Sequence, residues 1–162
     1  MRIGPFRRLR FYAGRLLTAE DLEAEQEYHR AKRRLQNRLL FGAGVVSGLG
    51  CTVESVGRIR VEAGVAVDCL GREIVVPAPQ TLDVPDARGL FVGIRYVERC
   101  VDPTPVGDEV EASMIEEGFE IVLSRESFAH THDPHGPRLA ACGEDHPVLL
   151  RAPDGGAETS PP

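Results

Sequence analysis

Four histidines and one cysteine near the end of the chain are the residues best able to bind a metal: His130, His132, His135, Cys142 and His146. Imidazole and thiolate groups are common zinc ligands, and a loop can fold four of them around a tetrahedral ion. Their order matches no zinc signature, however, and the paired spacing of structural zinc sites is missing. The alternative is a solvated loop whose histidines bind nothing. We therefore expect no cofactor and commit to no metal, with zinc left open for these five residues.

Acid–base or nucleophilic catalysis would need a reactive side chain beside an orienting partner. Ser47 lies in a Gly-rich stretch, residues 44–48, that resembles a nucleophile elbow, but that motif has a strand before the serine and a helix after it. Here the predicted order is reversed. The adjacent acids at 108–109 and 116–117 are more typical of solvated charge than of a catalytic dyad. The sequence thus predicts no enzyme, and a zinc-dependent enzyme built on the His-rich loop is the reading that metal analysis would test.

Charge is distributed unevenly along the 162 residues, whose formal net charge is −6. Residues 1–40 hold ten Arg or Lys and five Asp or Glu, a net of +5, whereas residues 41–162 hold nine and twenty, a net of −11. A basic arm beside an acidic body suits docking to a complementary partner or to a copy of itself. Acids in the first half of the predicted helix and the lack of interleaved aromatics argue against nucleic acid.

Hydropathy and the N-terminus bear on the compartment. No run approaches the roughly 18 apolar residues of a membrane span. The charged N-terminus is not followed by an apolar stretch of the kind found in secretory signals. We therefore expect a protein that is made and first folded in the cytoplasm.

Two N-terminal elements would position any docking surface. Residues 1–17 are basic and contain turn-forming glycines, which predicts an extended arm. A long amphipathic helix is predicted over residues 18–42, with Thr18 as its N-cap and Asp21 completing an approximate capping box. Acids crowd the start of this helix and basic residues its end, in the order that the helix dipole favours.

The apolar stripe of this helix has the spacing of one narrow face: Leu17, Ala24, Tyr28, Ala31, Leu35 and Leu39. A helix from 18 to 41 is about 36 Å long at 1.5 Å per residue, which exceeds what a small β unit can cover. Part of the stripe should then contact another element or another chain. The alternative is that the stripe packs against the chain's own sheet.

After residue 42 the periodicity of the sequence changes from helical to two, which predicts an antiparallel β domain over residues 43–151. Hairpins are expected at 51–62 and 65–76, the second with Gly71 at a position that needs positive φ. Further strands are expected at 81–84, 90–98, 119–124 and 146–152. Irregular loops are expected at 101–117, where Pro103 and Pro105 stand among acids, and at 129–145. The polar end, 152–162, is expected to be disordered.

Taken together, these elements predict an α+β fold: a long N-terminal helix followed by a small antiparallel β sandwich or barrel. Several phrases of the sequence, in order, resemble a module of phage tails. They lie at residues 14–22, 26–29, 33–40, 44–49, 64–68, 71–77, 94–98, 102–106 and 117–120. The resemblance covers residues 9–124 and is to baseplate or tail-associated components of phage-tail-like contractile injection systems. Larger relatives continue further, whereas this sequence stops soon after Arg151, so its position in a particle stays open.

The resemblance implies a structural role without catalytic residues, in contact with other subunits and in several copies. The expected docking residues lie in the arm and helix: Arg7, Arg8, Arg10, Arg15, Tyr28, Arg33, Arg34, Leu35, Arg38 and Leu39. The alternative is a binding module for glycan or cell envelope that uses the loops between strands. Exposed aromatics at one end of the sheet would favour that alternative.

Overall fold

The N-terminal segment leads into one long helix, α1 (Ala19–Leu40), which begins as the sequence predicts. The structure is a computed structural model that describes residues 5–55, 57–128 and 147–151. Thr18 is the N-cap: its side chain accepts from the backbone N–H of Asp21, and the Asp21 carboxylate accepts from the Thr18 N–H. This reciprocal capping box satisfies N–H groups that have no partner within the helix.

Nine strands follow in the described part of the chain and form three antiparallel sheets of three strands each. The first sheet has the order β1 (Gly44–Gly48), β4 (Gly64–Val67), β5 (Glu73–Val76). The second has the order β2 (Cys51–Ser55), β3 (Arg58–Val61), β6 (Gln80–Asp83). The third has the order β8 (Glu109–Ser124), β7 (Phe91–Val106), β9 (Val148–Arg151). The α+β class is therefore confirmed, and no closed barrel forms from these strands.

Both predicted hairpins are present. β2 pairs with β3, and β4 pairs with β5, each in an antiparallel register. Gly71, in the turn between β4 and β5, has a φ of +81°, which is the left-handed conformation that favours glycine. β1, which is bounded by Gly44 and Gly48, is a strand that the sequence analysis did not predict.

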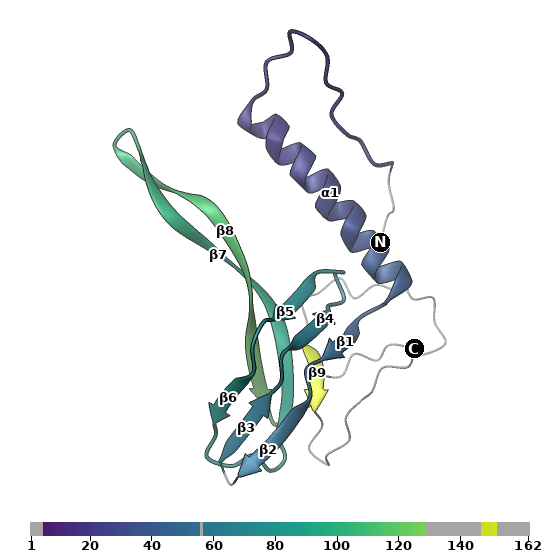
Figure 1. Cartoon of the computed structure of the whole chain (residues 1–162), viewed down its shortest axis with the longest axis vertical. Helices are drawn as coiled ribbons and strands as arrows, with labels where there is room; N and C mark the ends of the chain where they lie inside the picture. Colours follow the sequence, from purple (N-terminus) through teal and green to yellow (C-terminus); the bar gives the residue numbers. More distant parts are fainter. Residues whose placement is uncertain (1–4, 56, 129–146, 152–162) are drawn as a thin grey trace.

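The core lies between the sheets and is aliphatic. Inward-facing residues alternate along the strands, as in Ile59 and Val61 of β3 and in Val92 and Ile94 of β7, all of them fully buried. The helix adds no apolar side chain to this core, since Asn37 is the one residue of α1 that is buried. The β sheets are thus stabilised by their own apolar contacts, and α1 projects beside them (Figure 1).

The prediction of an irregular loop at 101–117 is wrong. β7 and β8 run through this segment as one continuous hairpin, from Phe91 paired with Ser124 to Val106 paired with Glu109. Proline breaks a ladder only where its missing N–H would bond to the neighbouring strand. Pro103 and Pro105 pair with Ala112 and Val110 without interrupting the register, so their nitrogens face away from β8. The hairpin extends beyond the body of the molecule (Figure 1).

Candidate functional site

The helix is attached to the β body by a polar joint around Asn37. Its side-chain Nδ2 donates to the backbone oxygen of Gly71 at 3.0 Å and to Glu73 Oε1 at 3.2 Å. Arg33, one helical turn earlier, donates through Nε to the same Glu73 oxygen at 2.8 Å. Because losing either partner would leave a buried polar atom without a hydrogen bond, the Asn37 amide stabilises this attachment. This joint therefore fixes where α1 meets the sheet.

A tight turn, residues 68–72, forms the other half of the joint. Asp68 is 1% exposed, and its Oδ1 accepts from the backbone N–H groups of Leu70 and Arg72 at 2.9 and 2.8 Å. Its second oxygen accepts from the Arg72 guanidinium. Gly71 lies so close to the helix that a Cβ there would be 2.2 Å from the backbone oxygen of Arg34. Only glycine fits this position, for both its φ and its space.

Arg72 connects the turn to β7. Its guanidinium lies 4.6 Å from the ring centroid of Tyr96, in cation–π contact. The Tyr96 hydroxyl donates to Glu98 Oε1 at 2.7 Å. Burial of the phenol, and then its hydrogen bond to the Glu98 carboxylate, raise the pKa of Tyr96 far above its ordinary value. The neutral phenol is thus part of the folded structure.

A cleft of about 100 Å³ lies at this joint, between the helix and the body. Its lining is formed by Arg30, Arg33, Arg34, Asn37, Gly71, Arg72, Glu73, Tyr96 and Glu117. Sites for small molecules are commonly about 300–1,000 Å³ and mostly apolar. This cleft is smaller, and Arg33, Glu73 and Arg72 are already engaged in the bonds that hold the joint. Its arrangement fits a structural connection better than a substrate site.

The apolar stripe of α1 faces away from the body. At about 100° per residue, positions two apart lie on opposite sides of a helix. Leu35 is two residues from both Arg33 and Asn37, which face the sheet, so Leu35 and its stripe point outward. α1 accordingly makes little contact with any strand. The alternative that this stripe packs on the chain's own sheet is wrong.

The N-terminal arm, residues 5–17, covers part of the stripe. Phe6 packs edge-on against Tyr28 with ring centroids 6.3 Å apart, and the Lys32 ammonium lies 4.9 Å from the Phe6 ring. Arg15 forms an ion pair with Asp21 at 2.6 Å, which ties the arm to the first turn of the helix. Leu17 and Leu39 of the stripe remain exposed. The arm and the uncovered part of α1 together form the first candidate docking surface.

The far end of the arm is apolar and basic. Phe11, Tyr12 and Leu16 are all exposed, Leu16 to 83%. Three arginines beside them, Arg7, Arg8 and Arg10, are exposed too. Within the described residues their guanidinium groups form no ion pair. Apolar side chains with unpaired cations around them are what a complementary acidic partner would bind.

A second candidate surface was missed by sequence reasoning: the distal hairpin, residues 99–116 of β7 and β8. All its residues are exposed except the half-buried Val101. Residues paired across an antiparallel ladder share a face. One face of the distal hairpin is therefore apolar beyond the pair Arg99–Glu116: it carries Val101, Pro103, Pro105, Val110, Ala112 and Met114. In the sequence, the alternation of these residues with polar ones indicates a strand. The two prolines obscured this signal because proline usually marks a loop.

The expected docking residues fall into three groups. Arg7, Arg8, Arg10 and the exposed Leu39 face solvent. Tyr28 and Arg15 hold the arm, while Leu35 is half-buried on the outward stripe. The rest lie toward the body: Arg33 and Arg34 line the cleft, and Arg38 contacts the turn at Gly71. The prediction thus combined an outward surface with the residues of an internal joint.

The candidates for chemistry lie elsewhere. Ser47 is an exposed residue of β1, which follows α1, so the elbow order is absent there as expected. His130, His132, His135, Cys142 and His146 lie outside the described residues. Within the described ranges, no three His, Cys, Asp or Glu side chains cluster as metal ligands would. The zinc hypothesis therefore stays a prediction.

Comparison with protein-family models gave no match, and no curated protein matched the chain either. In the part of the chain that the structure describes, no helix is long and apolar enough to cross a membrane.

Proposed function

We propose that this protein is a structural subunit of a phage-tail-like contractile injection particle, in its baseplate or a tail-associated part, and not an enzyme. It docks to other subunits through its N-terminal arm and helix, in several copies. The single observation that supports this proposal is the outward apolar stripe of α1. Leu39 on α1 and Leu17 just before it, both members of the stripe, remain exposed although a complete β core lies beside them.

A helix with an uncovered apolar face lacks part of the packing that normally stabilises a helix in a protein. Twenty-two residues of α1 span about 33 Å, and most of a helix's stability in proteins comes from packing its apolar face. In α1 that face is covered only in part, by Phe6 and its neighbours in the arm. A neighbouring subunit that buries the rest supplies the missing contact. The sequence phrases that resemble tail modules point to the kind of neighbour.

The test is purification of the tagged protein from its native cell, with identification of the proteins that copurify. Sheath and tube proteins should be present with the wild type. A variant with Leu17→Ser and Leu39→Ser removes two exposed apolar side chains of the stripe, and its copurification should fall at least several-fold. The matched control, Val53→Ser and Val75→Ser, changes exposed residues of the β body instead and should keep the partners. Recovery of the wild type as a monomer without partners would reject the proposal.

The glycan- or envelope-binding alternative has no support of this kind. Its expected signature is a group of exposed aromatics at one end of the sheet. In the described residues the exposed aromatics are Phe6, Phe11, Tyr12 and Phe41, all in the arm or at the end of α1. We therefore propose no second function.

A further inference from the structure

The molecule carries two exposed apolar surfaces of opposite charge, and they differ in structure. The distal hairpin holds one basic residue, Arg99, and five acids, Asp102, Asp108, Glu109, Glu111 and Glu116, a net of −4. The arm, residues 5–17, holds four arginines and no acid, a net of +4. We infer that the distal hairpin of one copy docks on the arm of a second copy, so that copies associate head to tail.

The apolar face of the hairpin is the contact surface. Val110 is 68% exposed and Met114 is 57% exposed, on the same side as Ala112 between them. A contiguous row of exposed apolar side chains is uncommon on a soluble protein without a partner. On the arm, Phe11, Tyr12 and Leu16 are exposed in the same way. Burial of the two apolar surfaces against each other supplies affinity, and the charges supply orientation and rate.

The edges of the hairpin are built against strand addition, which leaves its face for binding. The nitrogens of Pro103 and Pro105 point away from β8 and offer no N–H at the outer edge of β7. β8 carries Glu109, Glu111 and Glu116 along its exposed length. Proline and charge on an edge strand both oppose edge-to-edge pairing. Uncontrolled sheet extension is thereby disfavoured, while the apolar face stays accessible.

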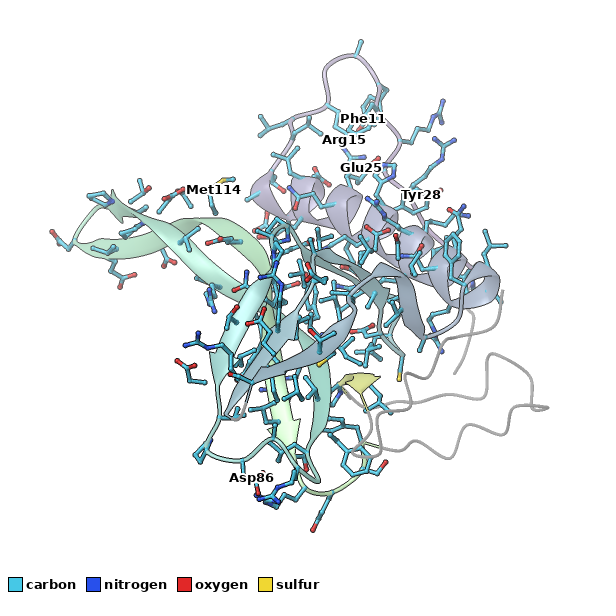
Figure 2. All side chains as sticks on the ribbon, turned by 60° about the horizontal axis from the view of Figure 1, so that its bottom comes forward. Phe11, Arg15, Glu25, Tyr28, Asp86 and Met114 are labelled. Carbon is cyan, nitrogen blue, oxygen red and sulfur yellow. The ribbon has the colours of Figure 1, made fainter. Side chains whose placement is uncertain are left out.

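Contact within one molecule does not satisfy these surfaces. The arm and the distal hairpin are separate projections from the body (Figure 1), and Figure 2 shows Phe11 and Arg15 on the arm apart from Met114 on the hairpin. No hydrogen bond or ion pair between described residues joins the two. A second copy is the partner that brings an acidic hairpin to the basic arm, so that the two charges are complementary.

Such a contact is heterologous, because the hairpin surface and the arm surface are different patches. After the first contact forms, one copy keeps a free arm and the other copy keeps a free hairpin. Repetition gives a ring if the rotation closes, and an open chain if it does not. In a ring every copy has the same environment, and in an open chain every copy except the two at its ends does.

The experiment uses sedimentation velocity of the purified full-length chain over a range of concentrations. In 0.1 M NaCl the wild type should form oligomers that grow with concentration, and 1 M NaCl should weaken them, since the screening length falls from about 10 Å to about 3 Å. A hairpin variant, Val110→Lys with Met114→Lys, should weaken association roughly tenfold or more, the size expected when a contact worth over about 1.4 kcal/mol is lost.

The matched control for that variant is Val106→Lys with Ile115→Lys. These two residues are 58% and 55% exposed and lie on the opposite face of the same hairpin. The control makes the same change in charge and apolar content, so it should retain most of the association. Circular dichroism of both variants checks that the fold is kept.

A mixing experiment separates head-to-tail contact from symmetric contact. An arm variant with Arg7, Arg8 and Arg10 changed to Glu, and the hairpin variant, should each be monomeric alone. Mixed together, they should form one-to-one pairs and stop there, because one intact hairpin and one intact arm remain. Self-association of the arm variant alone would overturn the inference, as would a monomeric wild type at every concentration. The inference would also be overturned if the control variant lost association to the same extent as the hairpin variant. Binding of the arm to nucleic acid and not to a second copy would overturn it as well.

The inference concerns the purified chain alone. Its failure leaves the copurification of sheath and tube proteins unaffected, and the reverse also holds, so the two proposals are tested separately.

Discussion

At the scale of single residues, the joint between helix and body depends on groups that cannot be exchanged. Gly71 has both a left-handed φ and no space for a Cβ, because Arg34 of the helix lies against it. Asn37 supplies an amide donor that an apolar residue of the same size would lack. Asp68 has three donors aimed at its carboxylate. These residues determine where α1 meets the sheet.

The substitution Gly71→Ala should therefore destabilise the protein by more than backbone strain alone. The left-handed conformation costs a residue with Cβ about 1–2 kcal/mol, and the collision with the Arg34 backbone adds to that. Gly14→Ala is the matched control: its φ is +86°, and its Cβ would meet nothing within 4 Å. Urea denaturation should give a larger loss for Gly71→Ala. Equal losses for the two variants would mean that the helix does not press on this turn.

Tyr96 makes stability depend on pH in the alkaline range. Burial and the hydrogen bond to Glu98 raise its pKa in the folded state, so the unfolded chain loses this proton first as pH rises. Stability from this group is complete below about pH 10, the pKa of an ordinary tyrosine, and is lost above it. We expect the wild type to lose more stability than Tyr96→Phe between pH 8 and pH 11, measured by urea denaturation. The same pH dependence in both proteins would contradict the assignment.

At the scale of elements, the distal hairpin is an addition to the fold and not a support for it. Its residues lie outside the apolar core, which ends near Tyr96 on β7 and Phe119 on β8. Its turn, Gly107–Asp108, has positive φ at the glycine, the position where a two-residue hairpin turn favours glycine. The turn and the ladder make this segment regular without tertiary contacts.

Shortening the hairpin should consequently leave the body stable. Deletion of 102–105 together with 110–113 joins the native turn to Val101 and Met114, and it preserves both register and side-chain alternation. We expect a melting temperature within a few degrees of the wild type, because no core residue is lost. Differential scanning calorimetry measures this. A large fall in melting temperature would show that the hairpin supports the sheet after all.

The sequence allowed much of this to be predicted, for reasons that differ between elements. The capping box at Thr18 and the hairpin turn at Gly71 are local signals, and both were found because neighbours in sequence decide them. The distal hairpin was misjudged because Pro103 and Pro105 usually mark loops, and their effect depends on which edge the nitrogens face. That orientation is set by pairing with residues 110–112, which a local reading does not see.

The joint was hidden from sequence for a similar reason. Asn37 and Gly71 are 34 residues apart, and neither is unusual in its own segment. Arg33 and Arg34 looked like part of a basic surface, whereas their position on the helix turns them to the cleft. The outward direction of the stripe at Leu35 could be found only once the body-facing side was known.

At the scale of the whole molecule, two kinds of attachment coexist. The sheets share an apolar core, whereas α1 is held by hydrogen bonds and an ion pair around Asn37, Arg33 and Glu73. Half-exposed ion pairs contribute little to stability in water. The arm and α1 should therefore open at a lower free energy than the β body.

Amide hydrogen exchange followed by mass spectrometry tests this expectation. Peptides from α1 should exchange faster than those from β3, β5 and β7, and low concentrations of urea should widen the difference before the body unfolds. Asn37→Ala should accelerate exchange in α1 while leaving exchange in β3 unchanged. Gln36→Ala, on the exposed side of the helix, should leave exchange unchanged in both elements. Exchange of α1 at the same rate as the core strands would mean that helix and body unfold as one unit.

The narrow footing of the helix on a single turn has a further consequence for how copies fit together. Tilting α1 about Gly71 would strain a few polar bonds but would wet no part of the aliphatic core. A protein hinged in this way can accommodate neighbours at different spacings at little cost to itself. The same chain could then take places of unequal curvature without a change in its fold.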